Sequence, residues 1–385
     1  MSSIVVFCHL RWNFVYQRPQ HLLSRLASRT PVFYIEEPVR DVEREPWLEV
    51  RKPCIGVTVV TPHTPAEAPG FHDDQLPVLE PLIEHFVQTH VIGEYVAWLY
   101  TPMALPLVTL LDPSAVVYDC MDELSAFKGA PKQLRQRESA LMSRADLVLT
   151  GGPSLFEAKR HLHPNVVCLP SAVDSVHFSR FTVLSDPQRR AMAEKLHDVI
   201  AAPRLGFFGV IDERLDLGLV AALADANSTW HVVMVGPVVK IDPADLPRRA
   251  NLHWLGQQDY ELLPHLLAQW DVCLLPFALN ESTRFISPTK TLEYMSFGLP
   301  IVSTAIRDVT AVHAETVRIG HDHASFVQAC RESLAETSEE RRARSLRMAS
   351  TVARCSWDAA VATVRGHLDE LARAQQEQPP IAARA

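Results

Sequence analysis

Several common signatures are missing from this 385-residue sequence, and each absence excludes a class of protein. Glycine is scarce, at 14 residues, which excludes collagen-like, glycine-linker and RGG-type chains. The seven cysteines form no CxxC pair, so neither a disulfide framework nor a zinc ribbon is indicated, and a reducing cytoplasm fits best. The net charge of −8 gives no general basic surface for nucleic acid. No apolar run approaches the ~18 residues of a membrane span, so we expect a soluble or at most peripheral protein.

Familiar phosphate-binding, hydrolase and metal-binding motifs are missing as well. The sequence contains no GxGxxG, no GxxxxGKS/T, no GxSxG and no HExxH. It has no DxD, and its two close histidine pairs, His161/His163 and His321/His323, fall in stretches of loop-like composition. We therefore expect no metal ion and no bound cofactor.

Short apolar segments alternate with helical stretches along the chain. The segments are rich in β-branched residues and mostly apolar on both faces, which is typical of buried parallel strands. We expect strands at 4–8, 32–35, 57–61, 96–100, 115–118, 147–150, 166–169, 204–208, 231–235, 252–255, 272–275, 301–304 and 317–319. The alternation predicts an α/β protein with parallel sheets.

A polar helical stretch without a strand, residues 182–203, divides the strands into two sets. We therefore expect two Rossmann-like, doubly wound domains facing a cleft, over 1–181 and 204–355, with 182–203 as the linker. Residues 376–385 are predicted to be disordered. The charged run at 339–344 is either a solvated helix face or a contact with an anionic membrane surface.

Ligands of open α/β sheets bind beyond the carboxyl ends of the strands, so the residues that follow each strand are candidates for a site. Gly209, Gly236 and Gly256 each follow a predicted strand of the second half. Because glycine lets the backbone approach a ligand closely, these three positions are predicted to line a ligand site.

The segment with the richest chemistry follows a buried strand and opens a helix. The helix is predicted to open at Pro288 or Thr289, with Ser287 well placed as its N-cap and Pro288 as its first residue. The free N–H groups of the helix start and the Lys290 ammonium would form an anion site. Glu293, one turn on, can accept hydrogen bonds from two vicinal hydroxyls, as on a ribose. A surface Lys–Glu pair is the alternative interpretation.

These motifs resemble GT-B glycosyltransferases, close to retaining family 4. The segment Ser287-Pro-x-Lys-x-Leu-Glu-Tyr-Met-x-x-Gly-x-Pro-Ile-Val is similar to the donor-site helix of that family. The second glutamate of the family's E-x7-E pattern binds the donor ribose, and Glu293 matches it. Other family landmarks are resembled, in the expected order, by the segments that begin at Asn165, Asn251, Asp271 and Ser356.

The resemblance implies an N-terminal acceptor domain, a C-terminal donor domain and a last helix, 356–375, that packs back on the N-terminal domain. It implies a nucleotide-sugar donor, such as a UDP-sugar, and a saccharide or lipid-linked acceptor, with retention at the transferred sugar. The run from Trp12 to Leu22 is similar to a bacterial subgroup linked with cell-surface polysaccharide synthesis. Peripheral contact with the inner face of the membrane would fit such a role.

The sequence departs from the family at the donor sugar and at the diphosphate. Phe285 stands where the family has its first glutamate, and Glu281 or Ser287 is the candidate substitute. Arg214 and Lys290 are the expected basic pair on the diphosphate. The base is expected to meet backbone near Gly236 and Gly256.

Five residues of the first half, four that end or follow strands and Arg18 just before the first helix, are candidates near the acceptor. His9 and Asp119 are the catalytic candidates, although a structural histidine is the alternative for His9. Arg11, Arg18 and Asp122 are predicted on the acceptor side. A helix start for Arg18 and a helix cap for Asp122 are the alternatives.

We expect a metal-independent glycosyltransferase in which Lys290, Arg214 and the helix start stabilise the departing diphosphate. Two alternatives stay open: a nucleotide-sugar epimerase of the same fold, and a catalytically degenerate subunit that binds a partner. No nucleic-acid partner is expected.

Overall fold

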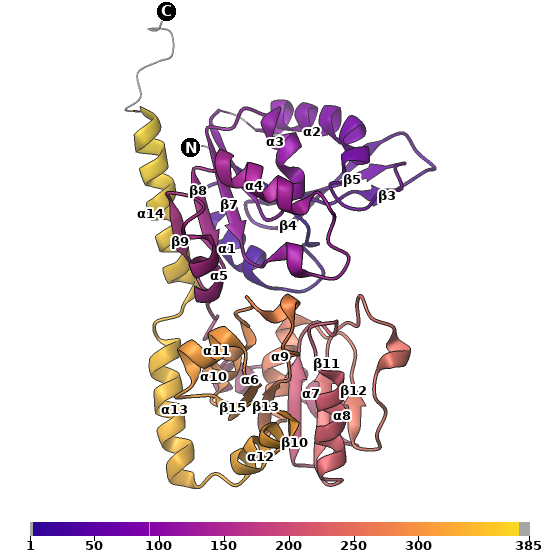
Figure 1. The fold of residues 1–385 in the computed structure, drawn as a ribbon, viewed down its shortest axis with the longest axis vertical. Coiled ribbons are helices and arrows are strands. Elements are labelled where there is room, and N and C mark those ends of the chain that lie inside the picture. The colour runs from indigo at the N-terminus through magenta and orange to yellow at the C-terminus, as the bar shows by residue number, and fades with distance from the viewer. Residues whose placement is uncertain (1–2, 92, 377–385) are drawn as a thin grey trace, which may run out of the picture. The chain divides into compact units, whose positions relative to one another are not determined.

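The computed structural model describes residues 3–91 and 93–376, and its elements are labelled in Figure 1. The chain forms two compact units. The first contains the N-terminal residues to 125, residues 129–170 and the C-terminal residues from 358, and the second contains 126–128 and 171–357. The predicted linker at 182–203 lies inside the second unit, and the predicted disordered tail, apart from residue 376, lies outside the described residues.

The first unit is built on a nine-stranded sheet with the order β3-β5-β2-β1-β6-β7-β8-β9 and with β4 beside β5. Only the β4–β5 pair is antiparallel among the described pairs of this sheet. The strands are β1 (Ser3–Cys8), β2 (Val32–Glu36), β3 (Val39–Arg40), β4 (Trp47–Cys54), β5 (Val57–Thr64), β6 (Tyr95–Leu99), β7 (Ala115–Cys120), β8 (Leu147–Thr150) and β9 (Val166–Cys168). The chain reverses direction across the sheet between β1 and β6, whose residues are all buried, so a switch point lies there.

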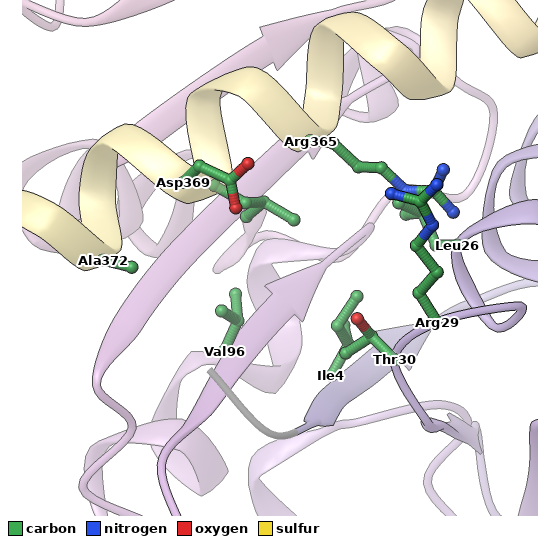
Figure 2. A pocket seen from close by; sticks show the side chains of 9 residues that line it. Ile4, Leu26, Arg29, Thr30, Val96, Arg365, Asp369 and Ala372 are labelled. Carbon is green, nitrogen blue, oxygen red and sulfur yellow. The ribbon is translucent and has the colours of Figure 1, made fainter.

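The last helix of the chain packs on the first unit. The helices of this unit are α1 (Arg18–Leu26), α2 (Leu76–His90), α3 (Leu105–Thr109), α4 (Leu134–Arg144), α5 (Pro153–Lys159) and α14 (Trp357–Gln376). Arg365 of α14 donates a hydrogen bond to the carbonyl of Arg25 at 2.9 Å. A pocket of about 160 Å³ lies between α14, the end of α1 and the amino ends of β1 and β6. Figure 2 shows the side chains that line it. This edge of the sheet is opposite to the one at which ligands bind.

The second unit is built on a six-stranded, fully parallel sheet with the order β12-β11-β10-β13-β14-β15. Its strands are β10 (Arg204–Phe208), β11 (His231–Val235), β12 (Leu252–Trp254), β13 (Val272–Leu275), β14 (Ile301–Thr304) and β15 (Arg318–Gly320). Counted within the unit, this is the 3-2-1-4-5-6 order of a doubly wound dinucleotide-binding sheet. The switch point lies between β10 and β13, and a ligand is expected beyond their carboxyl ends.

The helices of the second unit precede, connect and follow these strands, and α10 (Lys290–Phe297) begins later than predicted. They are α6 (Arg180–Ser185), α7 (Pro187–His197), α8 (Leu217–Ala226), α9 (Leu263–Leu267), α10 (Lys290–Phe297), α11 (Arg307–His313), α12 (His323–Leu334) and α13 (Ser338–Val352). The prediction of Ser287 as N-cap and Pro288 as first residue of α10 is wrong. The Pro288 carbonyl accepts the N–H of Thr291, three residues on, so a tight turn precedes the helix and Thr289 is its N-cap.

No helix in the described part of the chain is both long enough and apolar enough to cross a membrane.

Candidate functional site

Three predicted glycines meet at the carboxyl edge of the second sheet. The N–H of Gly209 donates to the carbonyl of Val235, and the N–H of Gly236 donates to the carbonyl of Gly256, both at 2.8 Å. Gly209 and Gly236 have φ angles of +144° and +145°, which favour glycine. A Cβ added to Gly236 would lie 1.8 Å from the Gly209 carbonyl oxygen, so only glycine fits there. The ends of β10, β11 and β12 are thereby held in one continuous backbone layer.

Lys290 lies directly against Gly209 at the switch point. A Cβ added to Gly209 would come within 2.0 Å of Lys290 Cε and 2.6 Å of its Nζ. The ammonium group also lies 5.8 Å from the ring centroid of Phe207, at the end of β10. The first residue of α10 therefore places a positive charge at the position where a doubly wound sheet binds its ligand. The N-terminal end of α10 adds the positive end of its dipole.

Glu293 is a buried carboxyl one helical turn from Lys290. Its residue is 8% exposed, and burial raises the pKa of its carboxyl to about 7, although the nearby Lys290 charge acts in the opposite direction. Burial without a hydrogen-bonded partner is costly for a carboxylate. Hydroxyl donors from a ligand would relieve that cost.

Tyr294 fixes α10 against the end of β10. Its buried hydroxyl accepts the N–H of Phe208 at 3.1 Å, and the two aromatic rings pack edge to face with centroids 5.0 Å apart. This contact sets the position of the helix that carries Lys290 and Glu293. Tyr294 was not predicted as a site residue, because its one sequence signal is its place beside Glu293 in the donor-helix motif.

Arg214 is held by Asp212, which was not predicted as a site residue. Its Nε and Nη2 donate to both carboxylate oxygens of Asp212, at 2.7 to 3.1 Å. Asp212 is 3% exposed, so the pair is partly desolvated. Arg214 also lies over the ring of Phe127, 5.4 Å from its centroid. The pairing neutralises much of the charge that Arg214 would offer to a diphosphate.

The remaining donor-side candidates lie in the turns before α10. Glu281 starts a short 3-10 turn, its side chain is 80% exposed, and it lies 3.7 Å from Arg284. The Arg284 guanidinium in turn lies 5.2 Å from the Phe285 ring centroid. The Thr289 carbonyl accepts the N–H of Leu292 at 3.0 Å. None of these contacts joins Glu281 to Lys290 or Glu293 among the described residues.

In the first unit, two predicted residues bind each other. Arg18, at the start of α1, donates from Nε and Nη2 to the Asp119 carboxylate at 2.8 to 3.2 Å. Its Nη1 donates to the carbonyl of Leu169 at 2.7 Å. The side chains are 4% and 0% exposed, so this is a buried ion pair between the ends of β7 and β9 and the first helix. Each group is therefore the buried counter-charge of the other.

The other first-unit candidates lie beyond β1 and β7. Arg11 donates to the carboxylate of Glu36 at 3.3 Å and to the carbonyl of Pro38 at 3.2 Å. His9 directly follows β1 and is half-buried, at the switch point of the first sheet. The carbonyl of Asp122 accepts the N–H of Leu124 at 3.1 Å.

Glu36 is a third residue that sequence reasoning missed. The residue is 1% exposed and accepts hydrogen bonds from Thr61 Oγ1 at 2.6 Å and from the N–H of Trp12 at 2.7 Å, besides Arg11. It anchors the loop after β1 to the neighbouring strands. The sequence signal that could have identified Glu36 is a glutamate at the end of a buried strand.

Within residues 3–91 and 93–376, no three His, Cys, Asp or Glu side chains are grouped so that they could hold a metal ion.

Known proteins resemble this chain over most of its length. Residues 202–336 match the family described as Glycosyl transferases group 1. A Bacillus subtilis protein named as a candidate teichuronic acid biosynthesis glycosyltransferase, TuaH, is 24% identical over 68% of this chain and 69% of its own. A trehalose-6-phosphate structure from E. coli bound with UDP-2-fluoro glucose aligns with a TM-score of 0.70 at 12% identity, over 98% of this chain and 100% of that one. Anabaena HepE in complex with UDP aligns with a TM-score of 0.66 at 13% identity, over 96% and 100%.

Proposed function

We propose that this chain, a glycosyltransferase of the GT-B fold related to glycosyl transferases group 1, moves a sugar from a nucleoside-diphosphate-sugar to a saccharide or lipid-linked acceptor. The proposed process is cell-surface polysaccharide synthesis, as the name of the Bacillus relative suggests for that protein. We propose a UDP-sugar as the donor, because UDP is bound in structural neighbours.

One observation carries the proposal: Lys290 lies against Gly209 at the switch point of the second sheet. A diphosphate at this point would meet the ammonium group and the N-terminal end of α10. A glycine at position 209 leaves room for both the lysine and the phosphate. A dehydrogenase-type phosphate loop is not needed, because the charge comes from a side chain and a helix start.

Glu293 is proposed to hold the ribose of the donor. Its carboxylate can accept hydrogen bonds from both vicinal hydroxyls, and hydrogen bonds to a charged group are the stronger kind. Because the group is buried, these bonds would be poorly screened by water. The same contacts would fix the nucleoside relative to Lys290.

The proposed chemistry is departure of the nucleoside diphosphate with retention. The bond from the anomeric carbon to the phosphate oxygen breaks, and negative charge grows on the diphosphate, which Lys290 and α10 stabilise. The acceptor hydroxyl attacks the same face and gives its proton to the departing phosphate oxygen. Arg214 would supply a second positive charge if the diphosphate competes with Asp212 for its guanidinium. Ser287, Pro288 and Glu281 are proposed to lie near the donor sugar, and the mechanism needs no metal.

The first unit is proposed to bind the acceptor at the carboxyl edge beside β1 and β6. His9 and Arg11 would contact it there. The buried pair of Arg18 and Asp119 would act by positioning the start of α1, and Asp122 would lie beside the same edge. A lipid-linked acceptor would bring the protein to the inner face of a membrane as a peripheral contact.

The test is a thermal-shift panel with UDP, GDP, ADP and their glucose conjugates, followed by NMR of the products formed from the donor that stabilises the chain. We expect one nucleotide to raise the melting temperature by several degrees, and a product whose anomeric proton has the same configuration as the donor. Turnover should persist in excess EDTA. Binding of no nucleotide, or an inverted product, would contradict the proposal.

A further inference from the structure

An aromatic residue of the first unit lies at the same carboxyl edge, away from β1. Trp47 begins β4, and in the antiparallel pairing it stands opposite His63 of β5. Because β4 runs against the parallel strands, its amino end lies at their carboxyl edge, where α/β sheets bind ligands. The Trp47 residue is half-buried.

Two contacts hold the indole of Trp47 in one orientation. Its Nε1 donates to Asp41 Oδ2 at 3.1 Å, and the His63 ring stacks on it with centroids 4.2 Å apart and planes 15° apart. The Trp47 hydrogen bond lowers the pKa of the Asp41 carboxyl, which stays ionised. The exposed Arg44 guanidinium lies over the same ring at 5.6 Å from its centroid. A preorganised ring loses little freedom when a ligand packs against it.

A carboxylate lies at the edge of this ring, because Asp41 Oδ2 accepts the Trp47 Nε1–H. A second carboxylate, that of Glu49, lies 3.5 Å from His63 Nε2 and 3.5 Å from Arg51 Nε. The C–H groups of a pyranose can pack on an aromatic face, and its hydroxyls can donate to carboxylates, which only accept.

We propose that Trp47 is a saccharide platform that holds a sugar residue of the acceptor, with Asp41 accepting its hydroxyls. The inference rests on the proposed function, in which the acceptor is a saccharide. The sugar replaces Arg44 on the ring, and an exposed cation–π contact of this kind is weak enough to be displaced.

The platform can be tested directly by saturation-transfer NMR on the full chain, with methyl β-glucoside and methyl β-N-acetylglucosaminide as probes. We expect transfer to both sugars at millimolar concentration. Trp47→Ala should abolish the transfer, whereas Trp47→Phe should keep part of it. Val50→Ala, at an exposed position on the same strand, is the matched control and should leave it unchanged. Equal transfer in wild type and Trp47→Ala, with both folded by circular dichroism, would overturn the proposal.

Failure of the platform and failure of the proposed function give different results. UDP binding is measured by calorimetry on the same samples, and Trp47→Ala should keep the UDP affinity within twofold, because Trp47 lies outside the second unit. Undiminished saturation transfer to the saccharide in Trp47→Ala would contradict the platform proposal, whether or not the variant binds UDP. If wild type does not bind UDP but its saccharide signal depends on Trp47, the proposed UDP-sugar donor is contradicted. The platform proposal is then still supported.

Discussion

Glu293→Gln is the substitution whose effects follow most directly from the geometry. The carboxyl is buried and its pKa is raised to about 7, so its charge changes in the range where the enzyme would work. Only the ionised form accepts hydrogen bonds from both ribose hydroxyls without carrying a competing proton. Donor affinity should therefore follow the ionised fraction of this one group.

The magnitude can be worked from that pKa. At pH 6 roughly one carboxyl in ten is ionised, and at pH 8 about nine in ten are, so the affinity for a ribose-bearing ligand should rise about tenfold between them. Glutamine cannot ionise and replaces one acceptor oxygen by a donor. Losing one charge-assisted hydrogen bond costs about 1.5–3 kcal/mol, so the variant should bind UDP roughly 10- to 150-fold more weakly at pH 8.

The free energy of unfolding should fall as the pH rises, whereas the donor affinity should rise. The pKa rises from 4.5 in the unfolded chain to about 7 in the folded one, so folding takes up a proton between these values. The wild-type free energy of unfolding should fall by about 3 kcal/mol across pH 4.5 to 7 because of this group. Glu293→Gln should remove that fall and be the more stable protein at pH 8, while it binds donor less well.

The assay is calorimetric titration of UDP at pH 6, 7 and 8 into wild type and Glu293→Gln. The 2′,3′-dideoxy analogue of UDP is the control ligand, because it keeps the phosphates, whose own ionisation lies near pH 6, and lacks the hydroxyls. The reasoning is refuted if UDP and its dideoxy analogue show the same pH dependence in wild type, or if Glu293→Gln binds UDP as wild type does.

Two further substitutions test other parts of the structure. Gly209→Ala places a Cβ 2.0 Å from Lys290 Cε at a φ of +144°, so we expect at least a tenfold loss of UDP affinity by calorimetry, whereas Gly366→Ala, whose Cβ meets nothing, should change it less than twofold. Asp119→Asn leaves the buried Arg18 guanidinium without its counter-charge, and urea unfolding should show a loss of about 3–5 kcal/mol; a loss under 1 kcal/mol would contradict the role of this pair in holding α1.

The regular part of the fold was predictable because local pattern determines it. Strands buried on both faces read as continuous apolar runs, and the bounds predicted for β8, β10, β11, β13 and β14 are those of the structure. Strand β3 and the antiparallel β4–β5 hairpin were missed, because β4 is half-buried to exposed and mixes charged with apolar residues over 47–54. Its antiparallel pairing depends on β5 across the turn and not on its own composition.

The site was predictable where one segment carries it. Lys290 and Glu293 lie on one helix with a recognisable motif, and Gly209 follows a strand, so sheet topology alone brings them to one edge. Pairing over long sequence distances was not predictable. Arg18 and Asp119 were expected to face ligands, and the structure joins them to each other across 101 positions, because burial makes each charge require the other.

The most direct test of the central claim compares UDP with uridine in wild type and Lys290→Ala. The claim is that the switch point of the second sheet binds a diphosphate through Lys290, beside a ribose held by Glu293. Calorimetry should show that Lys290→Ala weakens UDP binding roughly 10- to 100-fold, as expected for a lost charge-assisted contact. Uridine binding should fall much less, and only because the pKa of Glu293 rises further without the Lys290 charge. Equal UDP affinity in the two proteins, or an equal loss for uridine, would contradict the account.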